Sequence, residues 1–165
     1  MPALNTGTLA PDFVLPTTDG SNFSLSDALQ RGPVLAVFFK VSCPVCQYTL
    51  PYLERLYQAY KNQGVTLVAV SQNDRKDTLA FMREYGITFP VLLDDTSKYP
   101  VSNAYGLTNV PTLFWIAADG EIEISSVGWV RKDLEEINHR MAEAGAVRKA
   151  PLFQPGEEIA DFRAG

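Results

Sequence analysis

Two cysteines stand three positions apart in the segment Cys43-Pro44-Val45-Cys46. Such a C-x-x-C pair can switch between a dithiol and a disulfide, and near a βαβ pattern in a cytosolic protein it indicates thiol redox chemistry. The two residues are too close in sequence to brace a fold. Two cysteines and the single histidine, His139, do not readily supply the four ligands of a structural zinc site. We therefore expect no metal and no other cofactor.

The residues around the pair predict where it lies. The apolar run Val34–Phe39 precedes it and has the composition of a central strand buried on both faces. Pro44 suits the first position of a helix, and apolar residues then recur at steps of three and four until Gly64. Residues 66–70 form a second apolar run. The spacing predicts a βαβ unit in which the cysteine pair opens the crossover helix.

This position predicts different roles for the two sulfurs. At the amino end of a helix, unpaired backbone N–H groups and the positive end of the macrodipole favour a thiolate. Cys43 is expected at that end and exposed, and Cys46 one turn inside and shielded. Attack by Cys43 would form a mixed disulfide that Cys46 resolves. Lys40 is a candidate for adding positive charge beside the thiolate; the alternative is a solvated lysine at a strand end.

The remaining elements continue an alternation of strands and helices. Asp19-Gly20 and Asp119-Gly120 are hairpin turn signals. Asn73 or Asp74 can cap a helix that ends at Gly86. The order of elements predicts an α/β fold with a central mixed sheet flanked by helices. Further strands are expected at 13–15, 22–25, 91–93, 112–116 and 122–125, and further helices at 100–105 and 132–144.

The chain divides into a domain at 7–144 and a C-terminal extension at 145–165. The extension contains Pro151, Pro155 and Gly156 and shows no clear period from residue 149 onward, so we expect it to be loosely packed or disordered. The alternative is an extension docked along the domain. Four of its side chains provide much apolar surface for a free tail: Leu152, Phe153, Ile159 and Phe162.

Charge and hydropathy exclude several classes of function. Fourteen basic and nineteen acidic side chains give a net charge of −5, with no basic cluster for nucleic acid. No apolar run approaches the roughly 20 residues of a membrane span. Residues 1–7 have neither the basic region nor the apolar core of a signal peptide. The expected location is the cytoplasm, with the periplasm as the alternative if a leader was removed from a precursor.

The segment Ala10–Phe13, the hairpin, the strand at 34–39, the cysteine pair and Val110-Pro111-Thr112 together resemble the thioredoxin-like redoxins. That superfamily includes thioredoxins, TlpA-like thiol-disulfide oxidoreductases and AhpC/TSA peroxiredoxins. The similarity covers about residues 7–144 and implies a thioredoxin fold with an N-terminal β-hairpin extension. Pro51 is similar to a proline in the active-site helix of TlpA-like proteins. The resemblance implies a thiol-disulfide oxidoreductase in which Cys43 attacks and Cys46 resolves.

The resemblance also implies how substrate is held. In the family, the proline that matches Pro111 follows a cis peptide bond and faces the cysteines. Val110 is then expected to pair its backbone with substrate, and Pro44 to help orient it. The expected partners are a disulfide-bearing protein or a small thiol substrate, and an unidentified dithiol donor. In the cytoplasm, reduction of the substrate is the expected direction.

Two acidic residues of the family are absent. Thioredoxins have a buried aspartate six residues before the first cysteine, where this chain has Val37. Many TlpA-like reductases have a glutamate three residues after the second cysteine, where this chain has Thr49. Either acid would help deprotonate the inner thiol. The candidates to replace it are Tyr48, Thr49 and a bound water.

The main alternative is a peroxiredoxin of the AhpC/TSA type, which reduces peroxides. Peroxiredoxins place a threonine three residues before the peroxidatic cysteine. That position is Cys43 when the sequences are aligned on Cys46, and Lys40 when they are aligned on Cys43. Neither register restores the threonine, and no arginine clearly fits the place of the family's arginine, although Arg131 is a candidate. Dithiol exchange is therefore favoured. A non-catalytic interaction domain would require the cysteine pair to be incidental.

Overall fold

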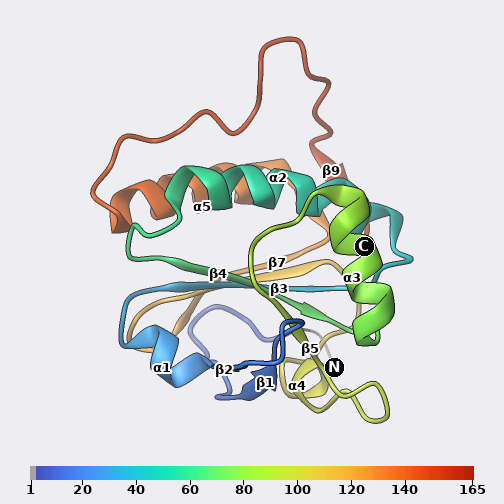
Figure 1. Cartoon of the computed structure of the whole chain (residues 1–165). Coiled ribbons are helices and arrows are strands. Elements are labelled where there is room, and N and C mark those ends of the chain that lie inside the picture. The colour runs from blue at the N-terminus through green and yellow to red at the C-terminus, as the bar shows by residue number, and fades with distance from the viewer. Residues whose placement is uncertain (1–2) are drawn as a thin grey trace.

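A five-stranded mixed sheet forms the centre of the computed structural model, which describes residues 3–165 (Figure 1). Its strands lie in the order β5-β4-β3-β6-β7. β3, β4 and β5 are parallel, whereas β6 is antiparallel to β3 and β7 is antiparallel to β6. The mixed sheet is thus as predicted. The strands are β3 (Val34–Phe39), β4 (Thr66–Ser71), β5 (Val91–Leu93), β6 (Thr112–Ile116) and β7 (Ile122–Val127).

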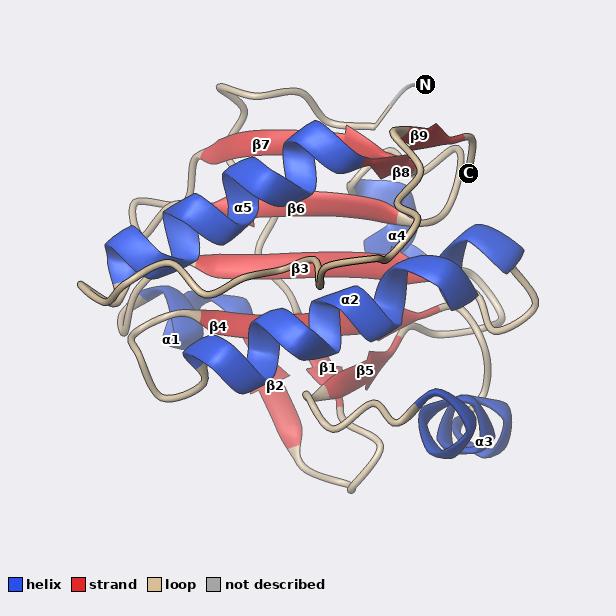
Figure 2. Cartoon of the chain, turned by 90° about the horizontal axis from the view of Figure 1, so that it is seen from above, coloured by secondary structure: helices blue, strands red, loops and turns tan. Residues whose placement is uncertain are grey.

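Helices cover both faces of this sheet. The two longest, α2 and α5, lie side by side on one face (Figure 2), and α3 packs into the same apolar cluster through Phe81. The opposite face carries α1, α4 and the N-terminal hairpin of β1 and β2 (Figure 1). The bounds are β1 (Val14–Pro16), β2 (Asn22–Ser24), α1 (Leu25–Leu29), α2 (Pro44–Tyr60), α3 (Arg75–Tyr85), α4 (Pro100–Ala104) and α5 (Arg131–Ala144).

The central strand β3 separates two apolar cores. All of its residues are inaccessible to solvent, and alternate side chains point to opposite faces, as in any strand. Leu35, Val37 and Phe39 belong to the cluster under α2 and α5. Val34, Ala36 and Phe38 belong to the cluster on the other face. Because β3 is buried on both faces, it fixes the start of α2 just beyond its own carboxyl end, at the centre of the sheet.

The caps of two helices confirm one local prediction and correct another. Asp74 caps α3 by accepting a hydrogen bond from the N–H of Asp77 at 2.8 Å, and Gly86 ends that helix with a left-handed φ of 67°. The predicted strand at 22–25 is wrong at its end. Ser24 instead caps the short helix α1, whose Asp27 N–H donates to the Ser24 hydroxyl at 3.3 Å. With five residues, α1 is too short to show a periodic apolar pattern in the sequence, so the sequence did not predict it.

The C-terminal extension, residues 145–165, is docked across α5 and α2 (Figure 1). Leu152 is only 5% exposed within the core under these helices. The Arg55 guanidinium donates to both carboxylate oxygens of Glu157, at 2.7 and 2.6 Å. Near its end the extension forms β9 (Phe162–Arg163), antiparallel to β8 (Trp129–Val130). Apolar burial and an ion pair therefore correct the expectation of loose packing; the domain boundary at 144/145 stays a prediction.

Shortening Leu152 measures how much the docked extension contributes to stability. Leu152→Ala is expected to lower the free energy of unfolding by about 2 kcal/mol, because buried methyl groups are lost and a cavity remains. Val147→Ala is the matched control, since Val147 is 39% exposed; a cost below about 0.5 kcal/mol is expected there. Chemical denaturation gives both values. Equal, small effects of the two substitutions would contradict a docked extension.

Candidate active site

The cysteine pair lies where the chain leaves β3 and enters α2. Cys43 is the N-cap residue of α2, with extended backbone angles of φ −85° and ψ 115°. Pro44 follows as the first helical residue, where its missing N–H costs nothing. The Cys46 backbone N–H donates to the Cys43 sulfur, with 3.1 Å between nitrogen and Sγ. This hydrogen bond supplies a donor to the sulfur that carries negative charge when Cys43 is a thiolate.

The two sulfurs lie in different environments, as the sequence predicts. Both are free thiols; Cys43 is half-buried, and Cys46 is 0% exposed within the apolar core. Burial raises the pKa of the Cys46 thiol, and its hydrogen bond with Cys43 raises that pKa further. Cys46 is therefore a thiol near neutral pH. Cys43 is the sulfur that an incoming molecule can reach.

The loop before β6 faces the cysteine pair. The Val110–Pro111 peptide bond is cis, as the family resemblance implies. The Cys43 thiol donates to the Val110 carbonyl, with 3.4 Å between Sγ and oxygen. The loop is fixed on either side of this contact: the Thr112 hydroxyl donates to the Asn109 carbonyl at 2.8 Å. The structure thus brings Cys43 and Val110 together from positions far apart in the sequence.

Lys40 lies beside the pair, and a hydrogen bond from its backbone lowers the pKa of Cys46 against the larger effect of burial. Its side chain is exposed, and its backbone carbonyl accepts the Cys43 N–H at 3.3 Å. Its positive charge lowers the pKa of Cys46, but this is the smallest contribution and burial outweighs it. The side chain lines a polar cleft of about 220 Å³ that also includes Asn109 and Val110. Lys40 therefore borders a cleft that shares Val110 with the contact to Cys43. Across residues 3–165, no group of three or more His, Cys, Asp or Glu side chains is placed to hold a metal ion.

The positions of the two missing acids are occupied by residues that serve packing. Val37 and Thr49 are both fully buried. The Thr49 hydroxyl donates to the Val45 carbonyl at 2.7 Å, a bond within α2. The Tyr48 hydroxyl accepts the backbone N–H of Ala160 at 3.2 Å. Both hydroxyl groups that were candidates for assisting Cys46 are thus engaged with other partners.

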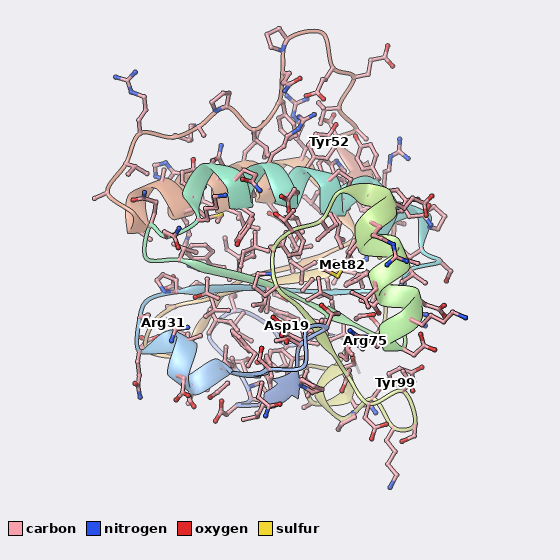
Figure 3. The ribbon with its side chains drawn as sticks, in the orientation of Figure 1. Asp19, Arg31, Tyr52, Arg75, Met82 and Tyr99 are labelled. Carbon is pink, nitrogen blue, oxygen red and sulfur yellow. The ribbon has the colours of Figure 1, made fainter. Side chains whose placement is uncertain are left out.

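An aromatic cluster next to the pair was not predicted from the sequence. The ring of Tyr48 packs edge-on against Trp129, with 4.7 Å between centroids, and Tyr52 lies against both Trp129 and Phe153. Figure 3 shows Tyr52 on the side of α2 that faces the extension. The Arg163 guanidinium lies 4.1 Å from the centre of the Tyr48 ring. The only sequence signal for this cluster was the apolar content of the extension.

Comparison with known proteins decides the family. Residues 6–125 match the model of the AhpC/TSA family. The chain belongs to the AhpC/TSA family. It is 36% identical over 132 residues to the thiol-disulfide oxidoreductase ResA of Geobacillus kaustophilus (strain HTA426), an alignment that covers 79% of this chain and 74% of ResA. ResA of Geobacillus thermodenitrificans (strain NG80-2) is 34% identical with the same coverage.

Solved structures agree with this assignment. A putative thiol:disulfide interchange protein DsbE from Chlorobium tepidum superposes with a TM-score of 0.75 at 28% identity, covering 87% of this chain and 99% of that one. The AhpC/TSA chain therefore has the thioredoxin fold with the N-terminal hairpin that the resemblance implied. Together with the ResA relatives, this makes the protein a thiol-disulfide oxidoreductase of the thioredoxin type.

No helix in residues 3–165 is long and apolar enough to cross a membrane.

Alkylation of the reduced protein measures the asymmetry of the pair. Near neutral pH iodoacetamide should modify Cys43 first, at least about 100-fold faster than Cys46, because the thiolate is the reactive form and Cys46 is buried. Modification of Cys46 should rise only in alkaline solution, as the pH approaches its raised pKa. Tandem mass spectrometry assigns the modified sulfur. Faster modification of Cys46 would reverse the assignment and favour the peroxiredoxin register.

Proposed function

We propose that this oxidoreductase exchanges disulfides through Cys43 as the attacking thiolate and Cys46 as the resolving thiol. The observation that carries the proposal is the contrast between the two sulfurs. Cys43 is reachable at the start of α2 and accepts the Cys46 N–H, whereas Cys46 is fully buried one turn inside. An accessible nucleophile beside a shielded thiol is the arrangement that two-step exchange requires.

The reaction transfers two electrons in two displacements. The Cys43 thiolate attacks one sulfur of the substrate disulfide, forms a bond to it, and releases the other substrate sulfur as a thiolate. Cys46 then loses its proton and attacks Cys43, which forms the Cys43–Cys46 disulfide and releases the second substrate thiolate. Protons from solvent and from Cys46 convert the products to thiols. A dithiol donor reduces the enzyme again by the reverse sequence.

The second displacement is expected to be the slower one. The Cys46 proton must leave a buried sulfur whose pKa burial raises, and no carboxylate occupies the positions of Val37 or Thr49. The Tyr48 and Thr49 hydroxyl groups each have another hydrogen-bond partner, so we favour a water molecule, the third candidate, as the acceptor of this proton. The mixed disulfide should therefore be the species that accumulates during turnover.

Substrate orientation is assigned to Val110, Pro111 and Pro44. The contact between the Val110 carbonyl and the Cys43 sulfur supports this assignment, since a chain approaching that sulfur also meets the loop. The proposed partners are a disulfide-bearing protein or small thiol substrate and a dithiol donor. Cytoplasmic location with reduction of the substrate stays a prediction, and the periplasm is its alternative; cell fractionation distinguishes them.

Single-cysteine variants test the two roles. Cys46→Ser should leave a nucleophile with no resolving partner, so mixed disulfides with substrates accumulate and persist. The yield of trapped mixed disulfide from Cys43→Ser should be at least about tenfold lower than that from Cys46→Ser, because its remaining thiol is shielded. Non-reducing electrophoresis and mass spectrometry of the trapped species give the yields and identify the partners. Better trapping by Cys43→Ser would contradict the proposed roles.

Peroxide reduction is the second candidate function, because the AhpC/TSA family to which the chain belongs includes peroxiredoxins. Stopped-flow oxidation of the reduced protein by hydrogen peroxide separates the two. The expected rate constant is within about tenfold of an ordinary low-pKa thiol, since no threonine precedes the cysteine to align the peroxide. A rate several orders of magnitude higher would instead favour a peroxidase.

A further inference from the structure

The last residues of the extension lie against the loop that contacts Cys43. The Asn109 side-chain amide donates to the Gly165 carbonyl at 3.1 Å. A Cβ atom on Gly165 would lie only 2.5 Å from the Val110 carbonyl oxygen, so a residue with a side chain could not occupy this place without a shift. That oxygen is the same one to which the Cys43 thiol donates. Gly165 therefore covers one side of the Val110 carbonyl oxygen, which accepts the hydrogen bond of the Cys43 thiol.

A second glycine permits this close approach. Gly128 adopts a left-handed φ of 78°, and a Cβ atom there would lie 2.5 Å from the Arg163 carbonyl oxygen. Immediately after it, Trp129 pairs with Arg163 in the two-stranded sheet of β8 and β9. Backbone thus packs on backbone from Gly128 to the end of the extension. This leaves little space between that end and Val110.

The same segment is attached to the start of α2. Ala160 donates its N–H to the Tyr48 hydroxyl, and its carbonyl accepts the Trp129 indole N–H at 2.6 Å. The Arg163 guanidinium stacks on the Tyr48 ring. Tyr48 is two residues after Cys46. Residues 160–165, which we call the C-terminal strap, thus join the helix of the cysteine pair to the loop of Val110.

We propose that the C-terminal strap determines which disulfides reach Cys43. It lies on the Val110 backbone, where an extended disulfide-bearing peptide would have to pair, so such a peptide must first displace the strap. A small disulfide needs only the half-buried sulfur and enters past it. This inference rests on the proposed function and specifies which disulfides the enzyme selects as substrates.

The strap is built to open without unfolding the rest of the extension. Residues 161–165 are all exposed, including Phe162 at 59%, and β9 pairs only as a two-residue strand. The earlier part of the extension is held separately by buried Leu152 and by the ion pair of Arg55 with Glu157. Segments with few buried apolar contacts open at low free-energy cost. Opening can therefore be confined to the strap.

Two variants displace the strap, and one controls for changes in the extension. Gly165→Val places a side chain where only 2.5 Å is available, and deletion of residues 161–165 removes the segment that reaches Val110. Glu158→Gln is the control, because Glu158 is an exposed residue of the same extension outside the strap. Thermal unfolding establishes that each variant is folded. If the deletion unfolds the protein, Gly165→Val alone decides.

The measurement is the second-order rate of oxidation of the reduced enzyme by two probes. One probe is a pair of unstructured ten-residue peptides joined by a disulfide, and the other is hydroxyethyl disulfide. Both displacing variants should react about tenfold faster with the peptide probe. This factor is the one expected if the strap of the wild-type enzyme is closed about nine-tenths of the time and only the open form reacts with the peptide. Their rates with the small probe should stay within about twofold of wild type, as should both rates of Glu158→Gln.

The possible results separate this inference from the proposed function. An unchanged or lower peptide rate in the displacing variants would overturn the strap's role, as would equal acceleration with both probes, which would mean general shielding of the sulfur. If wild-type enzyme reacts with neither probe, the proposed function fails and this inference falls with it. Acceleration confined to the peptide probe is the result that supports substrate selection.

Discussion

The start of α2 at Cys43 is the constraint on which the site depends. With Cys43 as the N-cap, Cys46 falls one turn inside, where its N–H points at the first sulfur and its own sulfur enters the apolar core. A helix begun one residue earlier or later would lose this division into a reachable and a shielded sulfur. Pro44 favours this start, and the fully buried strand β3 holds it in place. The chemistry thus follows from one helix terminus on a rigid strand.

Burial gives the inner thiol its protection and also slows its reaction. The core around Cys46 contains Val37 and Thr49 where related proteins carry acids, so that core has apolar packing in place of a proton acceptor. The C-terminal extension adds to this closed environment. It packs Phe153 on the aromatic cluster and uses the Tyr48 hydroxyl as an anchor for Ala160. The same residues therefore stabilise the extension and border the reactive pair.

Most of the fold was predictable because its signals are local. The run Val34–Phe39, the Asp74 cap and Gly86 each specify a strand or a helix end from neighbouring residues, and the cysteine pair was found by its spacing. That the loop of Pro111 faces the cysteines followed only from resemblance, and the hydrogen bond between Cys43 and Val110 joins distant positions. The docking of the extension depends on tertiary partners such as Arg55 for Glu157 and Trp129 for Ala160. No local pattern encodes such pairs, which explains why loose packing was expected.

The redox equilibrium of Cys43 and Cys46 shows whether the two residues work as one dithiol–disulfide pair. The protein is equilibrated in glutathione or dithiothreitol buffers of defined ratio, and its thiols are counted after acid quenching. We expect one reversible two-electron couple between these cysteines, with a potential between about −270 and −180 mV. A pair that remains as two thiols in the most oxidising buffer, or a disulfide that excess dithiothreitol does not reduce, would contradict it.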